Sequence, residues 1–414
     1  MRDTALDVCS MRQIDRRLGV PLCFLLTRLR NVLAPLRRRA DGPPNRIAFI
    51  KLAEQGATVL AYPAIREAAE MVGTENVFFL VFENNRPLLD LMEIIPRNNI
   101  IAIRTERTLQ TCVDALRAVW RMRRAKIDAV IDLEFFARSS AAMAFLSGAR
   151  VRVGFHGFVG ETPYRGDLMT HRLSFNPFLH ASQLFRMEVA AVRAQRQDLP
   201  AFDLRPSPDS DRMCVFEPPR LELLTVRKKL REQMKDSCAQ PLILLNANCS
   251  DLLPLRKWPE ERYVELARRL LAQYPEVHIA FTGAPSERRE IADLVSTVAS
   301  NRCCSMAGQT TLGELLVLYC LAEVLVTNDS GPAHFARLTP IDVVTLFGPE
   351  TPAVFGVNSP RSHVLWARLV CSPCVNAYNN RLSACKNNIC MQRISVEQVF
   401  NTVCEVYERR RSQA

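Results

Sequence analysis

The amino-acid sequence predicts an α/β protein with two doubly wound domains, each built on a parallel sheet. Short apolar runs alternate with helical stretches through most of the 414 residues. Prolines interrupt this alternation and mark residues 201–220 as a linker. Continuous apolar strands separated by helices are typical of a sheet covered on both faces, and the length suits two domains.

The first predicted domain, residues 46–200, follows a basic segment at 1–45. Four apolar runs in it have the length of strands: residues 47–50, 77–82, 100–103 and 127–131. Helices are expected from about Thr58, over 109–123 and over 138–146.

The second predicted domain, residues 221–395, restarts the same alternation. Its strands are expected at 242–245, 277–281, 324–326 and 343–346, and its helices at 261–271, 288–298 and 312–321. A last helix, near 396–410, falls in the terminal segment 396–414. Two such domains joined by a linker are expected to face a central cleft, with the carboxyl ends of both sheets toward it. Ligands of doubly wound sheets bind beyond these ends.

The N-terminal segment carries much of the formal net charge of +11. Residues 1–46 contain ten arginines and four aspartates, and the apolar run at 18–27 is too short to span a bilayer. No cleavage site follows, which argues against a signal peptide. An apolar run flanked by arginines predicts a segment that lies on an anionic membrane surface. The alternative is a helix packed on the protein with solvated arginines. Nucleic-acid binding is disfavoured because stacking aromatics are missing.

The fourteen cysteines are spread through a chain of α/β pattern, which favours a reducing compartment and free, largely buried thiols. One group has the spacing of a structural metal site: Cys371, Cys374, Cys385 and Cys390. Four thiolates could complete a tetrahedral zinc site. Zinc, a disulfide and free thiols all remain open for this group.

Residues 325–334 read as a strand, a polar turn and the start of a helix. Asp329 or Ser330 can cap the helix, Gly331 permits close approach of a ligand, and Pro332 suits the first turn. Backbone amides at such a helix start attract an anion such as a diphosphate. The alternative is an ordinary capped helix.

This segment resembles the donor-site signature of glycosyltransferase family 9, the heptosyltransferases of lipopolysaccharide assembly. Further stretches resemble the family's motifs in the same order: residues 50–52 with Gly56, 63–64, 131–133, 138–139, 256–259, 281–287, 307–312 and 346–349. The resemblance covers about residues 46–405, and coincidence does not explain so many ordered motifs. It implies the GT-B architecture, with two Rossmann-like domains and a nucleotide sugar in the second.

The resemblance also implies roles in donor binding. Lys257 would neutralise the phosphates of the leaving group, and Glu287, or else Glu290, would accept hydrogen bonds from the ribose hydroxyls. The diphosphate would be held by the polar turn and helix start: Asp329, Ser330, Gly331 and, one turn on, His334. The alternatives are a solvated lysine, an exposed glutamate at a helix start and a packed histidine.

The catalytic base departs from the family's pattern. Where family members have glycine followed by aspartate, this chain has Gly56 and Ala57. Glycosyl transfer to a hydroxyl is normally assisted by a carboxylate. Glu54, in the same loop, is the nearest replacement, and Asp132 and Glu134 are second candidates. The catalytic set is therefore predicted as Glu54, Lys257 and Asp329. A merely solvated Glu54 would fit a non-catalytic relative instead.

The acceptor is expected against the first domain. Histidines and arginines gather after its first strands, and the residues predicted to bind the acceptor are Asp132, His156, Arg165 and His171. Guanidinium groups pair with phosphates, which suits an acidic saccharide or a glycolipid. The alternative is a polar loop whose side chains satisfy one another.

Together these features predict an inverting, metal-independent transferase that needs no cofactor beyond a nucleotide-sugar co-substrate such as ADP-heptose. Its expected partners are that donor, a glycolipid or saccharide acceptor and an anionic membrane surface, with no nucleic acid. The expected place is the cytoplasm, peripheral on the inner face of the cytoplasmic membrane. A nucleotide-sugar epimerase is the rival enzyme class, since the same architecture serves several chemistries. The identities of the sugar, the nucleotide base and the acceptor stay open.

Overall fold

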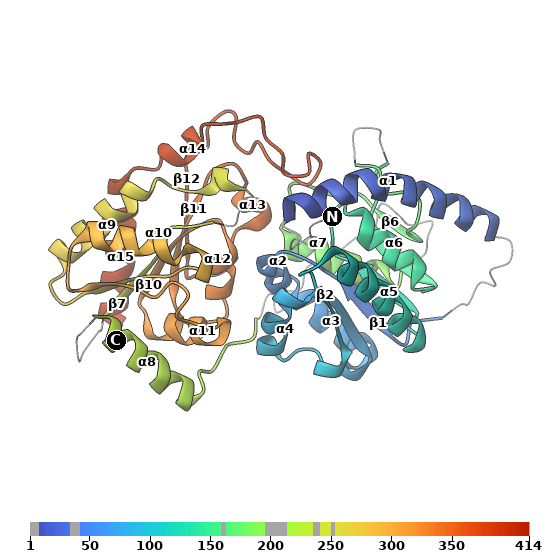
Figure 1. Cartoon of the computed structure of the whole chain (residues 1–414), viewed down its shortest axis with the longest axis horizontal. Helices are drawn as coiled ribbons and strands as arrows, with labels where there is room; N and C mark the ends of the chain where they lie inside the picture. Colours follow the sequence, from blue (N-terminus) through green and yellow to red (C-terminus); the bar gives the residue numbers. More distant parts are fainter. Residues whose placement is uncertain are drawn as a thin grey trace. The chain divides into compact units, whose positions relative to one another are not determined.

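A computed structural model describes residues 8–33, 42–158, 163–194, 213–234, 241–249 and 253–413. The chain forms two compact units, shown in Figure 1: unit 1 contains residues 1–212 and 376–381, and unit 2 contains residues 213–375 and 382–414. Most of the predicted linker lies outside the described residues, and residues 213–219 have no regular secondary structure. The sequence pattern did not indicate that the short segment 376–381 belongs with unit 1.

Unit 1 is built on a six-stranded sheet in the order β3-β2-β1-β4-β5-β6, with every neighbouring pair parallel. Its strands are β1 (Ile47–Ile50), β2 (Val77–Phe82), β3 (Ile100–Ile103), β4 (Ala129–Asp132), β5 (Val151–Phe155) and β6 (His171–Leu173). The four strands expected from the sequence are present. β5 and β6 are additional, and they cover part of the stretch that was predicted to bind the acceptor.

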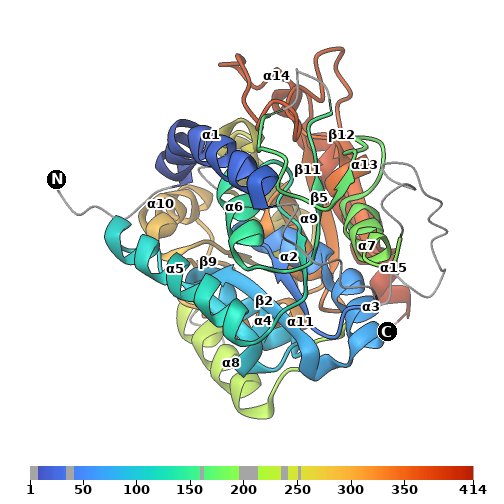
Figure 2. The ribbon, with the colours of Figure 1, turned by 90° about the vertical axis from the view of Figure 1, so that its right-hand side faces the viewer.

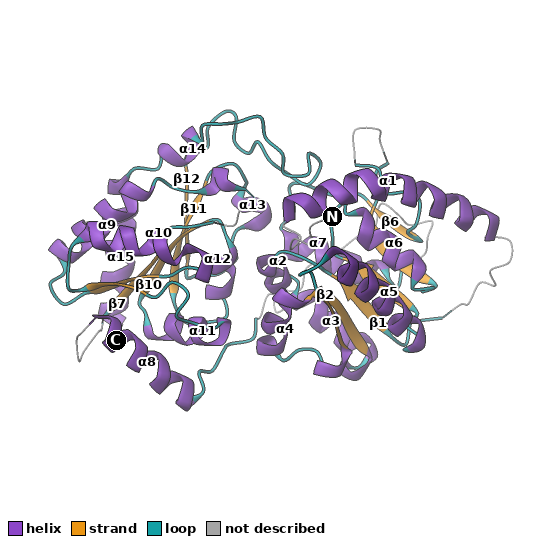
Figure 3. Cartoon of the chain, in the orientation of Figure 1, coloured by secondary structure: helices purple, strands orange, loops and turns teal. Residues whose placement is uncertain are grey.

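Helices cover both faces of this sheet (Figure 3). They are α1 (Val8–Leu33), α2 (Gln55–Leu60), α3 (Tyr62–Val72), α4 (Arg86–Met92), α5 (Thr108–Arg124), α6 (Arg138–Leu146) and α7 (Ala181–Ala191). One core cluster joins α1, α5 and α6 to the sheet through residues such as Cys23, Met122 and Phe145. The helices α3 and α7 pack against each other.

The N-terminal helix α1 docks on α6 through specific contacts. A Cβ at Gly19 would come within 2.7 Å of the Arg138 Cβ, so glycine is needed for the close approach. Asp15 accepts hydrogen bonds from the backbone amides of Arg138 (3.1 Å) and Ser139 (2.8 Å). These amides open α6, and a carboxylate stabilises such a helix start. Residues 8–33 therefore form a helix that packs on unit 1, and whether its exposed side lies on a membrane stays a prediction.

Unit 2 repeats the same topology with the order β12-β11-β10-β7-β8-β9, again with parallel neighbours. Its strands are β7 (Leu242–Asn246), β8 (His278–Phe281), β9 (Cys303–Ser305), β10 (Val324–Asn328), β11 (Asp342–Phe347) and β12 (Ser362–Trp366). The expected strands are again present, and β9 and β12 are additional.

The helices of unit 2 are α8 (Arg220–Met234), α9 (Glu260–Gln273), α10 (Arg288–Val298), α11 (Leu312–Leu321), α12 (Gly331–Ala336), α13 (Pro352–Phe355), α14 (Ile389–Gln392) and α15 (Val396–Gln413). A single core cluster joins α9, α10 and α15 to the sheet, with Trp258 and Tyr407 fully buried in it. The terminal helix expected near 396–410 is confirmed as α15.

Both sheets have the strand order of a Rossmann domain, in which the first and fourth strands lie side by side. In unit 1 these strands are β1 and β4, and in unit 2 they are β7 and β10. The connections that follow these two strands run to opposite sides of the pair. The carboxyl ends of the two strands therefore stay open to a ligand. The two candidate sites lie at these two positions.

Candidate functional site

Unit 2 gathers polar side chains where β7 and β10 end. Asn246 and Asn328 are the last residues of these strands, and Asp329 follows directly. All three are buried. Amides and carboxylates are costly to bury without partners, so their contacts define what the site is built to do.

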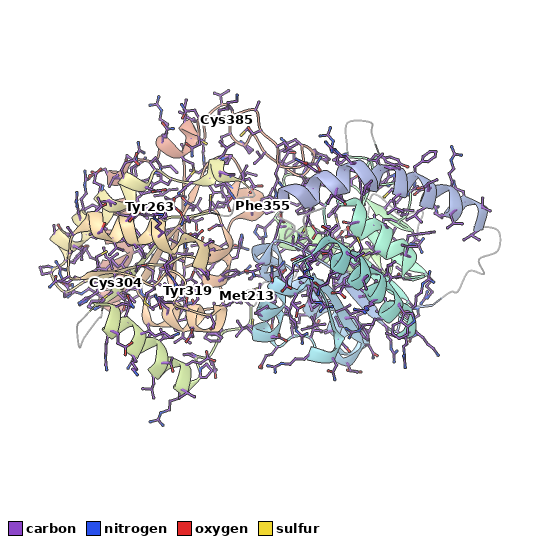
Figure 4. The ribbon with its side chains drawn as sticks, in the orientation of Figure 1. Met213, Tyr263, Cys304, Tyr319, Phe355 and Cys385 are labelled. Carbon is purple, nitrogen blue, oxygen red and sulfur yellow. The ribbon has the colours of Figure 1, made fainter. Side chains whose placement is uncertain are left out.

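Asn328 connects the end of β10 to the loop that follows β7 and to the start of α9. Its Oδ1 accepts hydrogen bonds from the backbone amide of Trp258 (3.0 Å) and from the hydroxyl of Tyr263 (3.2 Å), a residue of α9 labelled in Figure 4. Its Nδ2 donates to the carbonyl oxygen of Ala247 (3.0 Å). Asn328 was not among the predicted site residues, although a polar residue that closes a buried apolar strand marks it in the sequence.

Arg256 is the basic side chain that lies beside Asp329. It ends the turn Pro254–Arg256 and is buried, with Nη1 3.8 Å from Asp329 Oδ2 and 3.6 Å from Glu350 Oε2. Within the described part of the chain its Nε has no hydrogen-bond partner. The two carboxylates hold the guanidinium in place beside the end of β10.

Lys257, which was predicted for this role, is engaged elsewhere. Its ammonium forms ion pairs with Glu260 and with Glu290, whose Oε1 is 2.6 Å away. Burial lowers the pKa of Lys257, but these two hydrogen bonds outweigh it and raise the pKa. The side chain that the structure brings to Asp329 is therefore Arg256, one residue earlier.

The helix start after β10 differs from the expected cap. No side chain caps α12, and the Ser330 hydroxyl donates to the carbonyl oxygen of Asn328 (3.2 Å) instead. Pro332 stands in the first turn as expected. A Cβ at Gly331 would lie 3.1 Å from the Phe335 ring, and His334 is buried in the same helix. Capping by the Ser330 side chain was wrong, because its hydroxyl turns back to the strand.

Glu287 and Glu290 lie on neighbouring turns with different contacts. Glu287 Oε2 accepts a hydrogen bond from the backbone amide of Ala284 (2.6 Å), which closes the turn, and burial raises the pKa of Glu287. Hydrogen bonds with Lys257 and Glu260 lower the pKa of Glu290. One carboxylate oxygen of Glu287, which was predicted to bind the ribose, is thus already hydrogen-bonded within its own turn.

Unit 1 places a charged cluster at the ends of β1 and β4. Lys51 follows β1 and is fully buried, with Nζ 2.9 Å from Glu134 Oε2 and 3.3 Å from Glu54 Oε2. The other oxygen of Glu134 accepts a hydrogen bond from the backbone amide of Leu52 (2.8 Å). Lys51 therefore ties together the loops after the first and fourth strands.

Glu54, the predicted base, is held by cations. Its Oε1 pairs with Arg381 (2.5 Å) and lies 4.0 Å from Arg12, in addition to its contact with Lys51. Burial acts to raise the pKa of Glu54, but these cations prevail and hold it well below the usual range of a carboxyl group. Such a carboxylate accepts a proton poorly until Arg381 moves away. Ala57, at the family's usual position of the base, is buried in α2.

Arg381 reaches Glu54 because the segment 376–381 packs on unit 1. The hydroxyl of Tyr378 donates to the carbonyl oxygen of Phe175, and its ring lies 5.3 Å from the Phe175 ring and 5.7 Å from that of Phe136. An arginine more than three hundred residues from Glu54 cannot be paired with it from a single sequence.

Asp132 and Arg165, both predicted to bind the acceptor, bind each other. They form a fully buried ion pair, and Asp132 Oδ2 also accepts a hydrogen bond from the Ser140 hydroxyl (2.9 Å). Arg165 donates to the carbonyl oxygens of Phe135 and Phe155 (3.1 Å each). Burial raises the pKa of Asp132 to about 6. These contacts make the pair a support of the loops around it.

Glu188 is a buried acid that the sequence pattern did not reveal. It lies on α7, and neither carboxylate oxygen has a hydrogen-bond partner among the residues that the structure describes. Burial, and next the charge of Asp132, raises its pKa well above the usual value. Burial therefore favours the protonated, uncharged form of Glu188.

The two predicted acceptor histidines occupy different environments. His171 is buried on β6, and its Nδ1 lies 2.9 Å from the Thr170 hydroxyl. His156 follows β5, and its ring lies 4.9 Å from the Phe158 ring. Burial lowers the pKa of His156, which favours the neutral imidazole.

The cysteine group of the second half does not form a metal site in the described residues, where no cluster of three or more His, Cys, Asp or Glu could hold an ion. No disulfide links Cys371, Cys374, Cys385 and Cys390, and Cys374 Sγ accepts a hydrogen bond from the Ser383 hydroxyl (3.4 Å). Cys385 is exposed on the loop before α14 (Figure 4), whereas Cys390 is buried.

None of the described helices combines the length and the apolar character that a bilayer span requires.

The chain is similar to known proteins over parts of both units. A profile of glycosyltransferase family 9 (heptosyltransferase) matches residues 116–384, well over half of the chain. The match includes β4, Arg256 and Asp329.

Two curated relatives and one solved structure illustrate the similarity. Lipopolysaccharide heptosyltransferase 2 of Escherichia coli (strain K12) is 32% identical over 111 residues, 27% of this chain and 31% of that protein. Lipopolysaccharide core heptosyltransferase OpsX of Haemophilus influenzae is 22% identical over 317 residues, 75% of this chain and 80% of that protein. The first match thus spans only about a third of the relative's length. The structure of E. coli ADP-heptose lps heptosyltransferase II has a TM-score of 0.64 at 18% identity, covering 88% of this chain and 99% of that one. This likeness establishes the fold, two Rossmann-like domains of the GT-B type.

Proposed function

Since the chain belongs to glycosyltransferase family 9, we propose that it transfers a sugar from a nucleoside-diphosphate donor to a saccharide or glycolipid acceptor. The observation that carries this proposal is the pair of Arg256 and Asp329 at the carboxyl ends of β7 and β10. A buried guanidinium suits a diphosphate, whose charge grows as the bond to the sugar breaks.

The donor would lie on unit 2. Arg256 would stabilise the leaving diphosphate, with Asp329, Ser330 and Gly331 forming the adjacent backbone and His334 one turn further. Lys257 and Glu290 would act as a charged pair at the edge of the site, and Glu287 would face the ribose. ADP-heptose is the donor we propose, because the solved structure with the same fold is named for it.

The acceptor would lie on unit 1. Its hydroxyl would lose a proton to Glu54 and form a bond to the anomeric carbon, while the nucleoside diphosphate leaves with the electrons of the broken bond. Attack opposite the leaving group inverts the anomeric centre. Because Arg381 and Lys51 lower the pKa of Glu54, acceptor binding would have to displace Arg381 before Glu54 can act as the base.

The ion pair of Asp132 and Arg165 would hold the loops around the acceptor in place. His156 and His171 would offer their ring nitrogens to hydroxyl groups of the acceptor. We propose a lipopolysaccharide-type glycolipid as the acceptor. The enzyme would then work in the cytoplasm, at the inner face of the membrane. Arg256 would take the place of a metal ion at the diphosphate, so we expect transfer to be unchanged by EDTA.

The proposal is tested by measuring transfer and nucleotide release together. Purified protein is incubated with ADP-heptose, with and without a heptose-deficient glycolipid, and both ADP and the mass of the glycolipid are followed. We expect ADP only with acceptor, in a one-to-one ratio with the added sugar. A changed donor sugar without acceptor would identify an epimerase, and nucleotide binding without turnover would identify a non-catalytic relative.

A further inference from the structure

The outer surface of unit 1 carries two exposed apolar stripes, on helices α1 and α5. On α1 the exposed apolar side chains recur every three or four residues: Ile14, Leu18, Leu22, Leu25, Leu29 and Val32. Leu18 and Leu25 are 66% and 64% exposed. This spacing places them along one side of the helix, beside the buried residues that pack on α6.

Helix α5 repeats the pattern independently of the N-terminal segment. Its exposed apolar side chains are Leu109, Val113, Leu116 and Trp120, opposite the buried Asp114, Ala118 and Met122. Leu116 is 67% exposed and Trp120 57%. Most surface leucines of soluble proteins occur singly, so two aligned stripes on one unit need an explanation.

The two helices flank α6 on the same face of the sheet. Both pack against α6, and all three contribute to one core cluster with the sheet. Figures 1 and 2 show α1, α6 and α5 in succession along this side of unit 1. The outer sides of α1 and α5 therefore belong to one surface, which we call the two-helix face.

Basic side chains border both stripes. On α1 they include Arg16, Arg17 and Arg28, and on α5 Arg117, Arg121, Arg123 and Arg124, all exposed. Two of them lie over aromatic rings, Arg28 over Phe24 and Arg124 over Trp120. The acids of the two helices, Asp15 and Asp114, are paired with Arg138 and with Arg104.

We infer that the two-helix face docks on an anionic lipid bilayer, with α1 and α5 lying in the interface. Apolar side chains enter the boundary of headgroups and chains, while arginines meet the acidic headgroups. A second copy of the chain is disfavoured because it would set arginines against arginines. The inference rests on the proposed function only in that a glycolipid acceptor lies in such a bilayer.

The test is flotation of the full-length protein with vesicles of phosphatidylcholine alone or with 30% phosphatidylglycerol. The variants are Leu18→Gln/Leu25→Gln on α1, Leu116→Gln/Trp120→Gln on α5, and all four together. The matched control is Leu221→Gln/Leu224→Gln on α8, where two leucines are similarly exposed in unit 2. Circular dichroism and the midpoint of thermal unfolding show that each variant is folded.

We expect binding to the anionic vesicles, and much less to the neutral ones. Each double variant of the two-helix face should lower the partition coefficient roughly tenfold, since several apolar groups leave the interface, and the α8 control should not change it. Brominated lipid should quench Trp120, with the quenching lost in Trp120→Phe. Equal flotation of wild type and quadruple variant would overturn the inference. So would absent flotation together with a dimer that the α5 variant dissociates.

Transfer to a water-soluble acceptor fragment separates this inference from the proposed function. Soluble transfer that persists in the quadruple variant, with flotation lost, supports both. Soluble transfer without any wild-type flotation overturns only the membrane inference. Flotation without transfer to either acceptor overturns only the proposed function.

Discussion

Arg256 Nη1 lies 3.8 Å from Asp329 Oδ2, whereas the adjacent Lys257 pairs with Glu290 at 2.6 Å. The sequence places two basic residues before Trp258, and the structure distinguishes them. Trp258 is buried and its amide is bonded to Asn328, which fixes the chain so that Arg256 turns inward. We therefore propose Arg256 as the cation of the donor site.

Replacing Arg256 by methionine should abolish most of the stabilisation of the leaving diphosphate. One lost donor of this kind typically costs about 10²–10³-fold in kcat. Lys257→Met is the matched control, and we expect a change of about tenfold or less, because its partners are exposed in part. Steady-state kinetics with ADP-heptose checks both. A larger loss for Lys257→Met than for Arg256→Met would reverse the assignment.

Arg381 should control the pH profile through Glu54. Removing this cation in Arg381→Met lets the pKa of Glu54 rise toward the ordinary value of about 4.3. The acidic limb of kcat/KM should then move to higher pH, and Glu54→Gln should lose about 10²–10⁴-fold in kcat at every pH. The comparison uses Arg193→Met, a change on the same unit away from this cluster. Full activity of Glu54→Gln would assign the base elsewhere.

The ion pair of Asp132 and Arg165 should matter more for stability than for recognition. Arg165→Met leaves a buried carboxylate unpaired, which typically costs about 3–5 kcal/mol in the free energy of unfolding. The exposed Arg172 is the control, and Arg172→Met should change the free energy by about 0.5 kcal/mol at most. Urea unfolding measures both. Normal stability of Arg165→Met with a raised KM for the acceptor would instead favour direct acceptor binding.

Glu188 should give unit 1 a pH-dependent stability. Its pKa is raised in the folded state, so above the ordinary pKa of about 4.3 the folded protein keeps a proton that the unfolded chain has lost. The free energy of unfolding therefore falls as the pH rises through that window. Glu188→Gln has no such proton to lose, so it should become progressively more stable than wild type as the pH rises above about 4.3. Glu70→Gln, at an exposed site, is the control. Parallel pH curves for wild type and Glu188→Gln would contradict this account.

Much of the fold follows from local pattern, because long apolar strands and amphipathic helices alternate visibly. Three of the four missed strands have weak patterns: β6 and β9 have three residues each, and β12 is only partly buried. The donor turn at Asp329 was also predictable, since a strand end, a glycine and a proline coincide there.

The remaining site contacts depend on distant parts of the chain. Arg381 meets Glu54 only because Tyr378 anchors its segment on unit 1. Glu188 lies on an ordinary amphipathic helix, and only packing reveals that its carboxyl group is buried. The choice between Arg256 and Lys257 depends on the direction in which one turn faces, which spacing alone does not determine.

The transfer reaction itself tests the central claim most directly. ADP-heptose of known anomeric configuration is incubated with the protein and a heptose-deficient glycolipid, and the product is analysed by mass spectrometry and NMR. The account predicts one heptose added per ADP released, with inverted anomeric configuration, and loss of this product in Arg256→Met. Release of ADP that does not depend on acceptor, or a product with retained configuration, would contradict it.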